Sequence, residues 1–170
     1  GYSISGTPKS AVVYRAPYVG MIYGGGIIAY ILQSGDPGYV SGEKHGIIAA
    51  TVDQSTGIGW AKSDYYSTLL GNTSTQFGSG ATNTDNIIAQ NGSGTNYAAG
   101  LARAYSGGGY NDWYLPSQEE LYKLYLNKDI IGGFVTGTLY WSSSEFTDYG
   151  ATDNAYALSF SSGNTGTHVV

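Results

Sequence analysis

The chain has 170 residues, a length that suits one domain with a hydrophobic core. Its net charge is −5 and it has only seven Lys and Arg, which argues against a nucleic-acid partner, because neutralising phosphates needs clustered cations. The lack of Cys excludes disulfides, thiolate metal sites and a cysteine nucleophile, and the lack of an apolar run of about 18 residues excludes a membrane-spanning helix.

The chain begins with a polar, irregular stretch. We interpret residues 1–18 as a linker or the end of a preceding segment, and residues 19–170 as one binding domain cut from a longer protein. Within 19–50, two β-branched apolar runs flank a Gly-Asp-Pro-Gly turn, which predicts a long β-hairpin. The glycines of GGGIIA at 24–29 feed a strand rather than open a helix, so they predict a tight bend and not a dinucleotide-binding loop.

The middle of the chain changes from loop to helix. Residues 51–82 have no period and are rich in Gly, Ser and Thr, which predicts a loop that Trp60 fixes to the core. Two short helices are expected next, over 82–92 with a cap at Asn83 or Thr84, and over 94–105.

The stretch YNDWYLPSQEELYKLY, at 110–125, gathers carboxylates, an amide and tyrosines, as a working site would. Each group also has a local explanation. Ser117 and Glu120 have the spacing of a capping box, and Leu121 and Leu124 recur on one helical face. The stretch therefore predicts a helix that braces the fold rather than a site that contacts a ligand.

The C-terminal part returns to β texture. Alternating segments at 138–146 and 154–160 predict two strands, and SSGNTG at 161–166 predicts a turn that leads to a last strand. The order of elements predicts a mixed α+β domain whose small sheet joins both ends of the chain. Four residues are expected to support it from the core: Trp141, Tyr156, Leu158 and Phe160.

Catalytic chemistry is not expected. His45 and His168 have no partner at the spacing of a metal site or a triad, and the chain has no G-x-S-x-G elbow. Glu119 and Glu120 are adjacent on the predicted helix, so their side chains point about 100° apart and cannot act as an acid/base pair. The sequence thus indicates a protein that is not an enzyme.

The region from 145 to 168 combines aromatic with small polar residues around predicted strands and turns. Rings stack on sugars or apolar side chains, while amides and hydroxyls supply hydrogen bonds, so this composition favours a binding surface. The alternative is a solvated loop with structural tyrosines. The predicted ligand-binding residues are Phe146, Asp148, Tyr149, Asp153, Asn154, Ala157, Ser159, Asn164, Thr165 and His168.

The same region contains the oxygen-bearing residues of a candidate Ca²⁺ site. Asp148, Asp153 and Asn154 could supply carboxylate and amide ligands from one loop. The alternative is that these residues form turns, as loop Asp and Asn usually do. No other cofactor is expected.

Two motifs resemble a known family. The chain matches the pattern D-W-x-L-P-[ST]-x-x-E-L, then a Y-W-S-S-[ST]-E step, then a strand ending in F-S-x-G. The matching residues are Asp112, Trp113, Leu115, Pro116, Ser117, Glu120 and Leu121, then Tyr140 to Glu145, then Phe160, Ser161 and Gly163. The chain resembles, over about 19–168, the Lcl C-terminal family, named after the Legionella collagen-like adhesin.

The resemblance implies a C-type-lectin-like fold, with two or three short helices and a small twisted antiparallel sheet in which N- and C-terminal strands pair. It implies an extracellular location on a bacterial surface or a virion, a cell-surface glycan or protein receptor as partner, and presentation as a homotrimer. Some members resemble the variable proteins of diversity-generating retroelements. A structural head that caps or trimerises a fibre is the alternative function.

The chain departs from the family in two respects. The family closes with a further R-x-V-R-x-F strand, whereas this sequence ends at THVV. Its acidity also argues against the sulfated polysaccharides that the type adhesin is thought to favour. Formylglycine-generating enzymes share the fold but need cysteine, which this chain lacks.

Overall fold

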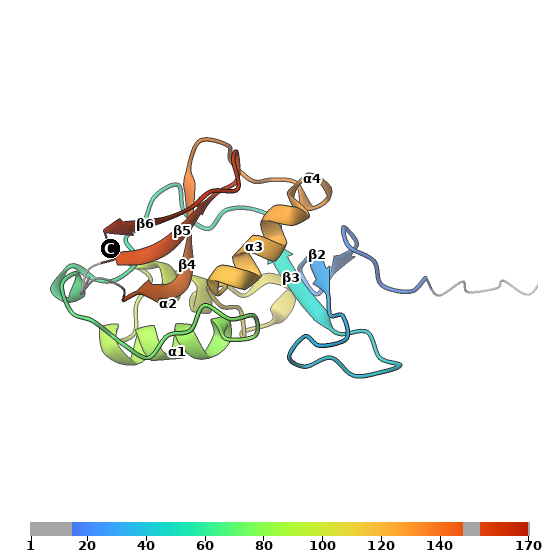
Figure 1. Cartoon of the computed structure of the whole chain (residues 1–170), viewed down its shortest axis with the longest axis horizontal. Coiled ribbons are helices and arrows are strands. Elements are labelled where there is room, and N and C mark those ends of the chain that lie inside the picture. Colours follow the sequence, from blue (N-terminus) through green and yellow to red (C-terminus); the bar gives the residue numbers. More distant parts are fainter. Residues whose placement is uncertain (1–14, 148–153, 170) are drawn as a thin grey trace, which may run out of the picture.

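The computed structural model describes residues 15–147 and 154–169. Over these ranges the chain is a mixed α+β structure with two three-stranded antiparallel sheets (Figure 1). The strands are β1 (Ile22–Tyr23), β2 (Gly26–Ile31), β3 (Gly46–Ala50), β4 (Leu139–Phe146), β5 (Asn154–Ser159) and β6 (Thr165–Val169). The helices are α1 (Gly80–Asn91), α2 (Ala98–Ala104), α3 (Gln118–Leu126) and α4 (Lys128–Ile131), with short 3₁₀ turns at Ser63–Tyr65 and Gly107–Gly109.

The predicted N-terminal hairpin is confirmed. β2 pairs with β3 in antiparallel register, and the Gly24-Gly25 pair makes the tight turn from β1 into β2. One face of this sheet is apolar and buried, with Ala29 and Ala49 packed against Ile131 of α4. The alternation of the sequence thus places one side of the hairpin in the core.

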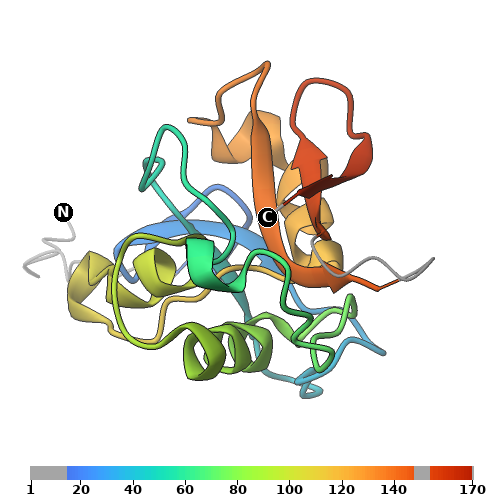
Figure 2. The same cartoon turned by 90° about the vertical axis from the view of Figure 1, so that its left-hand side faces the viewer.

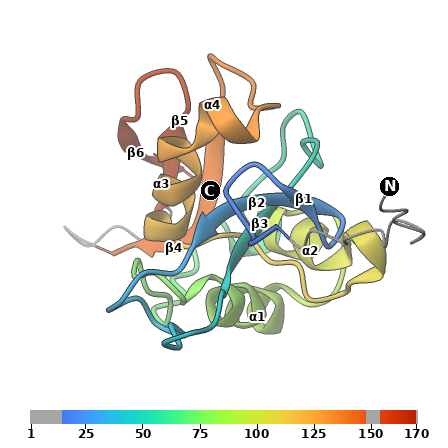
Figure 3. The ribbon, with the colours of Figure 1, turned by 90° about the vertical axis from the view of Figure 1, so that its right-hand side faces the viewer.

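The C-terminal sheet has core on both faces. β5 lies between β4 and β6, and Leu158 and Phe160 pack against Leu121 of α3 on one side. On the other side, Ala155 packs into a cluster with Trp60, whose predicted anchoring role is confirmed. Figure 1 shows α3 between this sheet and the N-terminal sheet, and Figure 3 shows it beside β4; α3 contacts strands of both sheets.

The prediction that one sheet joins both ends of the chain is wrong for the described residues, because the two sheets are separate. The outer edge of β4 is already occupied by irregular chain. The amide of Ser143 donates to the carbonyl of Pro116 at 2.7 Å, and the amide of Glu145 donates to the hydroxyl of Thr73 at 2.9 Å. These two donors of β4 are therefore not available to an N-terminal strand.

The helix that the capping box predicts is confirmed. The amide of Glu120 donates to the hydroxyl of Ser117, and the carboxylate of Glu120 accepts from the amide of Ser117 at 2.8 Å. The helix predicted over 82–92 is α1, and its predicted start is wrong, because α1 begins at Gly80. Asn83 lies inside α1, where its buried amide holds the loop before the helix instead of capping the helix.

A buried polar stretch, Ser142–Glu145, connects most of these elements; we call it the SSSE segment. Its three serines are fully buried. The register of β4 and β5 shifts between Trp141 and Glu145, so the serines have no regular partner residues in β5. The indole of Trp60 donates to the carbonyl of Ser142 at 2.7 Å. The amide of Asn83 in α1 donates to the hydroxyl of Ser143 at 3.2 Å.

The SSSE segment also holds α3 and the chain before α1. The hydroxyl of Ser144 accepts from the amide of Gln118, the first residue of α3, at 3.0 Å. The same hydroxyl donates to the carbonyl of Ser74 at 2.8 Å. Because a buried polar group is costly unless it has a partner, each of these bonds fixes the position of one neighbouring element.

Carboxylates hold the irregular chain before α1 at two places. The amides of Leu70 and Gly71 donate to the carboxylate of Glu145 at 2.8 and 2.7 Å. Further along, the amide of Phe77 donates to the carboxylate of Glu119 at 2.8 Å. This stretch has no regular structure, and the glutamates supply the acceptors that a neighbouring strand would otherwise supply.

Glu145→Ala is expected to lower the free energy of unfolding by about 2–4 kcal/mol, because it removes the acceptor of two amides that hydrogen-bond to a charged group. Urea unfolding measures the effect. The control is Glu43→Ala, which breaks only an exposed pair with His45 and is expected to cost less than about 1 kcal/mol. Equal losses in the two variants would contradict the role assigned to Glu145.

The loop after β2 is fixed by Asp36. Its carboxylate accepts from the amide of Gln33 at 2.7 Å and from the hydroxyl of Tyr30 at 2.8 Å. The ammonium of Lys123 lies 4.6 Å from the centre of the Tyr30 ring, which ties the loop to α3. The Gln33 amide, followed by the Tyr30 hydroxyl, lowers the pKa of Asp36 below its usual value.

The lowered pKa of Asp36 predicts a pH dependence. The folded state holds the charged carboxylate better than the unfolded state does, so this contribution is present above the unfolded pKa and is lost as the pH falls through the folded pKa. In an NMR titration, the Asp36 carboxyl should ionise below about 3.9, the value for an unperturbed Asp. A midpoint at or above that value would contradict these hydrogen bonds.

Candidate ligand-binding surface

The predicted binding region falls on the β5–β6 hairpin and the end of β4. Asp148, Tyr149 and Asp153 lie outside the described residues, and with them most of the candidate Ca²⁺ site. Among the described residues no group of three acidic or His side chains could hold a metal ion. Asn154 is the first residue of β5 and pairs with Phe146, the last residue of β4.

The structure places the predicted residues on two opposite faces of the sheet. Phe146 contacts Tyr156 edge-on, with ring centres 5.4 Å apart, on the face that α3 covers further along. Ala157 and Ser159 lie on the opposite face. Ala157 is only 2% exposed and pairs with Trp141 of β4 in the sheet, so this conformation leaves almost none of its side chain open to a ligand.

His168 lies on the same face as Ala157, because it pairs with Ala155 in the register of β5 and β6. Its ring meets the edge of Trp141 with centres 6.2 Å apart, and the Trp141 indole donates to the carbonyl of Ile58 at 2.9 Å. His168 therefore rests on a fixed aromatic ring rather than beside Asn164.

Asn164 and Thr165 are exposed at the turn of the hairpin, as predicted. The turn is closed by its own hydrogen bonds. The amide of Gly163 donates to the carbonyl of Ser159 at 2.8 Å, and the amide of Ser159 donates to the carbonyl of Asn164 at 3.1 Å. The hydroxyls of Ser159 and Ser161 lie 2.8 Å apart. Figure 2 shows this turn, in red, at the same end of the molecule as the loop before β4.

An aromatic cluster lies directly beneath the turn. Phe160, which is fully buried, stacks on Phe134 with ring centres 4.1 Å apart and contacts Tyr140 at 4.7 Å. Tyr125 of α3 meets the edge of Phe160, and its ring lies against the backbone of Gly163. The turn is thus supported by rigid rings.

Two residues of this surface are missed by the sequence prediction. Tyr122 and Tyr125 stack on one side of α3 with ring centres 5.8 Å apart, and Tyr122 is 43% exposed. The ammonium of Lys128 lies 4.6 Å from the Tyr125 ring centre. The spacing of the two tyrosines on a predicted helix signals a shared face, but only the fold brings that face to the turn.

We call this set the hairpin surface. It combines exposed hydroxyl and amide groups of the turn with the tyrosine pair of α3. Hydroxyl and amide groups beside a ring can hydrogen-bond and stack on a sugar or on a polar peptide. Its members are Ser161, Ser162, Asn164, Thr165, Tyr122 and Tyr125.

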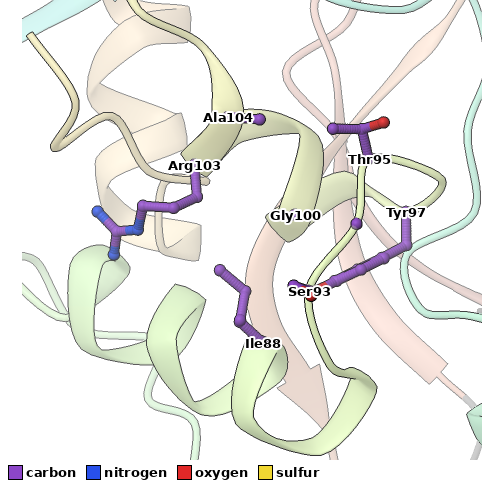
Figure 4. A pocket seen from close by; sticks show the side chains of 8 residues that line it. Ile88, Ser93, Thr95, Tyr97, Gly100, Arg103 and Ala104 are labelled. Carbon is purple, nitrogen blue, oxygen red and sulfur yellow. The ribbon is translucent and has the colours of Figure 1, made fainter.

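A separate pocket of about 210 Å³ lies between α1 and α2 (Figure 4). Its walls include Ile88 and Tyr97, and Arg103 stands at one side. The guanidinium of Arg103 is already engaged, because it donates to two carbonyls and pairs with Asp85. This pocket therefore offers a ligand mainly apolar contact.

Comparisons of this chain with protein-family models, with curated proteins and with solved structures gave no match. The C-type-lectin-like fold and the family resemblance therefore stay predictions, while the mixed α+β class is confirmed. Within the described ranges, no helix is long and apolar enough to cross a bilayer.

Gly163→Ala is expected to destabilise the turn. Gly163 has φ +74°, and a Cβ there would lie 2.5 Å from the Tyr125 ring. Gly132 is the matched control, because its φ is +72° and nothing lies within 4 Å of an added Cβ. We expect Gly163→Ala to cost about 1–2 kcal/mol more than Gly132→Ala in urea unfolding. Equal costs would show that the ring does not support the turn.

Proposed function

We propose that the chain is a non-enzymatic ligand-binding domain, an adhesin or receptor-binding module of a bacterial surface protein or a phage tail fibre. Its hairpin surface recognises a glycan or a protein on another cell. A C-type-lectin-like fold related to the Lcl C-terminal family is part of the same proposal.

The observation that carries the proposal is the contrast between the fixed backbone and the unengaged side chains of the turn. The backbone of the turn is closed by hydrogen bonds and rests on Phe160 and Tyr125. Within the described part of the chain, the side chains of Asn164 and Thr165 make no hydrogen bond. A surface that is ordered before binding loses little conformational entropy when a ligand arrives.

The positions of the acidic groups support the same proposal. Glu119, Glu120 and Glu145 each accept backbone amides, so their carboxylates serve the fold. The hydroxyls of the SSSE segment are engaged too: that of Ser143 accepts from the side-chain amide of Asn83, and those of Ser142 and Ser144 donate to backbone carbonyls. These groups, which could otherwise act as acids, bases or nucleophiles, have structural partners.

One observation favours the alternative of a fibre-capping or trimerisation head. Ile22 of β1 is 76% exposed and Ile130 of α4 is 61% exposed. Ile130 lies against Gly20, two residues before Ile22, because a Cβ added to Gly20 would lie 2.6 Å from its side chain. Large apolar side chains exposed to water, one on the edge strand β1 and one on α4, suit contact with another copy of the chain.

The test of the proposed function is a glycan array and a whole-cell pull-down with the unmodified chain and two variants. Asn164→Ala and Tyr122→Ala remove one hydrogen-bonding group and one stacking ring from the hairpin surface, and each should weaken retention about tenfold. Tyr39→Ala is the control, because Tyr39 is similarly exposed but lies in the loop between β2 and β3.

Unchanged retention in both hairpin variants would contradict the proposal. Light scattering on the same preparations tests the alternative. A trimer that Ile130→Ser dissociates, together with no retention on any array or cell, would favour the fibre head instead.

A further inference from the structure

The outer face of the N-terminal sheet carries a pocket of about 180 Å³ that the hairpin surface does not include. Ile28 and Ile48, which are partners in the register of β2 and β3, form its apolar floor. Pro17 and Tyr23 close one side. The pocket is smaller than those that hold drug-sized ligands, so it suits a single small group.

One exposed tyrosine lines this pocket, and a second lies near it. Tyr23 lines it and is 61% exposed, and Tyr110 is 49% exposed. The Tyr110 ring packs over Gly24, within 3.5 Å of where a Cβ would stand, and Ile48 touches the same point at 3.3 Å. The rim thus presents aromatic rings to solvent directly beside the apolar floor.

The pocket is lined by one basic side chain, that of Lys44, and by one imidazole. Lys44 and His45 both belong to it. His45 pairs with Glu43 at 2.7 Å, but Lys44 makes no hydrogen bond, ion pair or ring contact within the described residues. The structure describes three other lysines, and each has a partner: Lys62 a carbonyl, Lys123 a tyrosine ring, and Lys128 a carboxylate and a ring.

Lys44 therefore presents an unengaged ammonium beside apolar and aromatic side chains, in a chain with a net charge of −5. It attracts an anion, and the rings favour a ligand with an apolar face. A carboxylated sugar has both features: one carboxylate, and a ring whose C–H face stacks on tyrosine. Charge complementarity therefore favours this occupant over a neutral glycan or a second copy of an acidic chain.

We propose that this pocket binds one carboxylated sugar residue, of the uronic or sialic acid class. Lys44 binds the carboxylate, His45 stands beside it, and Tyr23 stacks on the sugar ring above Ile28 and Ile48. The inference is independent of the hairpin surface, because α3 lies between the N-terminal sheet and β5–β6 (Figure 1).

The test is an NMR titration of the full chain with methyl β-glucuronide and with the methyl α-glycoside of N-acetylneuraminic acid. Methyl β-glucoside is the neutral control for the uronic acid. We expect the amides of Tyr23, Ile28 and Ile48 to shift with at least one acidic sugar and to stay unchanged with the glucoside at the same concentration.

Two charge-matched variants locate the carboxylate. Lys44→Met keeps the aliphatic stem and breaks no bond, so it should leave Tm unchanged while it raises the Kd about tenfold or more. Lys128→Met removes the same charge beside the hairpin surface and should leave the Kd unchanged. Tyr23→Leu should also weaken binding, because it removes the ring that stacks on the sugar.

Four outcomes would overturn the inference. They are no amide shift with either acidic sugar, equal shifts with the glucoside, a loss of binding in Lys128→Met but not in Lys44→Met, and light scattering that shows this face buried in a dimer which Tyr23→Leu dissociates. Retention by the hairpin surface is tested separately by Asn164→Ala and Tyr122→Ala, so failure here is distinguishable from failure of the proposed function.

Discussion

The structure depends on the need to satisfy a buried polar stretch in the middle of the core. The three serines of the SSSE segment are fully buried, and their hydrogen bonds reach Trp60, α1 and α3. A buried hydroxyl or amide without a partner costs about 1–3 kcal/mol, so each neighbour must keep its position for the segment to remain buried. This constraint lets a chain with long irregular stretches adopt one arrangement, since hydrogen bonds replace the missing strands.

In that arrangement, two faces of the molecule expose side chains that do not contribute to the core. The β5–β6 turn rests on the rings of Phe160 and Tyr125 and projects small polar groups. The outer face of the N-terminal sheet presents tyrosines around an unengaged lysine. Both have the composition of recognition surfaces, and both are attached to rigid elements, which suits binding with little reordering.

Local patterns predict the local structure well, because the signals act over a few residues. The capping box at Ser117 and Glu120 and the hairpin of β2 and β3 follow from such signals. The separate sheets do not, because the residues that engage the edge of β4, Pro116 and Thr73, are distant from it in the sequence. In the hairpin, alternation along β5 predicts that Ala157 and Tyr156 lie on opposite faces of the sheet. The burial of the Ala157 face is not predicted, because it comes from the distant core cluster around Trp60. Tyr122 joins the surface only through the packing of α3 on Gly163 and Phe160.

Native-state hydrogen exchange tests most directly whether the SSSE segment and the glutamate carboxylates hold the irregular chain before α1. The amides of Leu70, Gly71 and Phe77 lie in a stretch without regular structure, yet each donates to a carboxylate. We predict that they exchange with a free energy close to that of global unfolding. Exchange of these amides at the rate of an exposed loop, while the strands stay protected, would contradict the account.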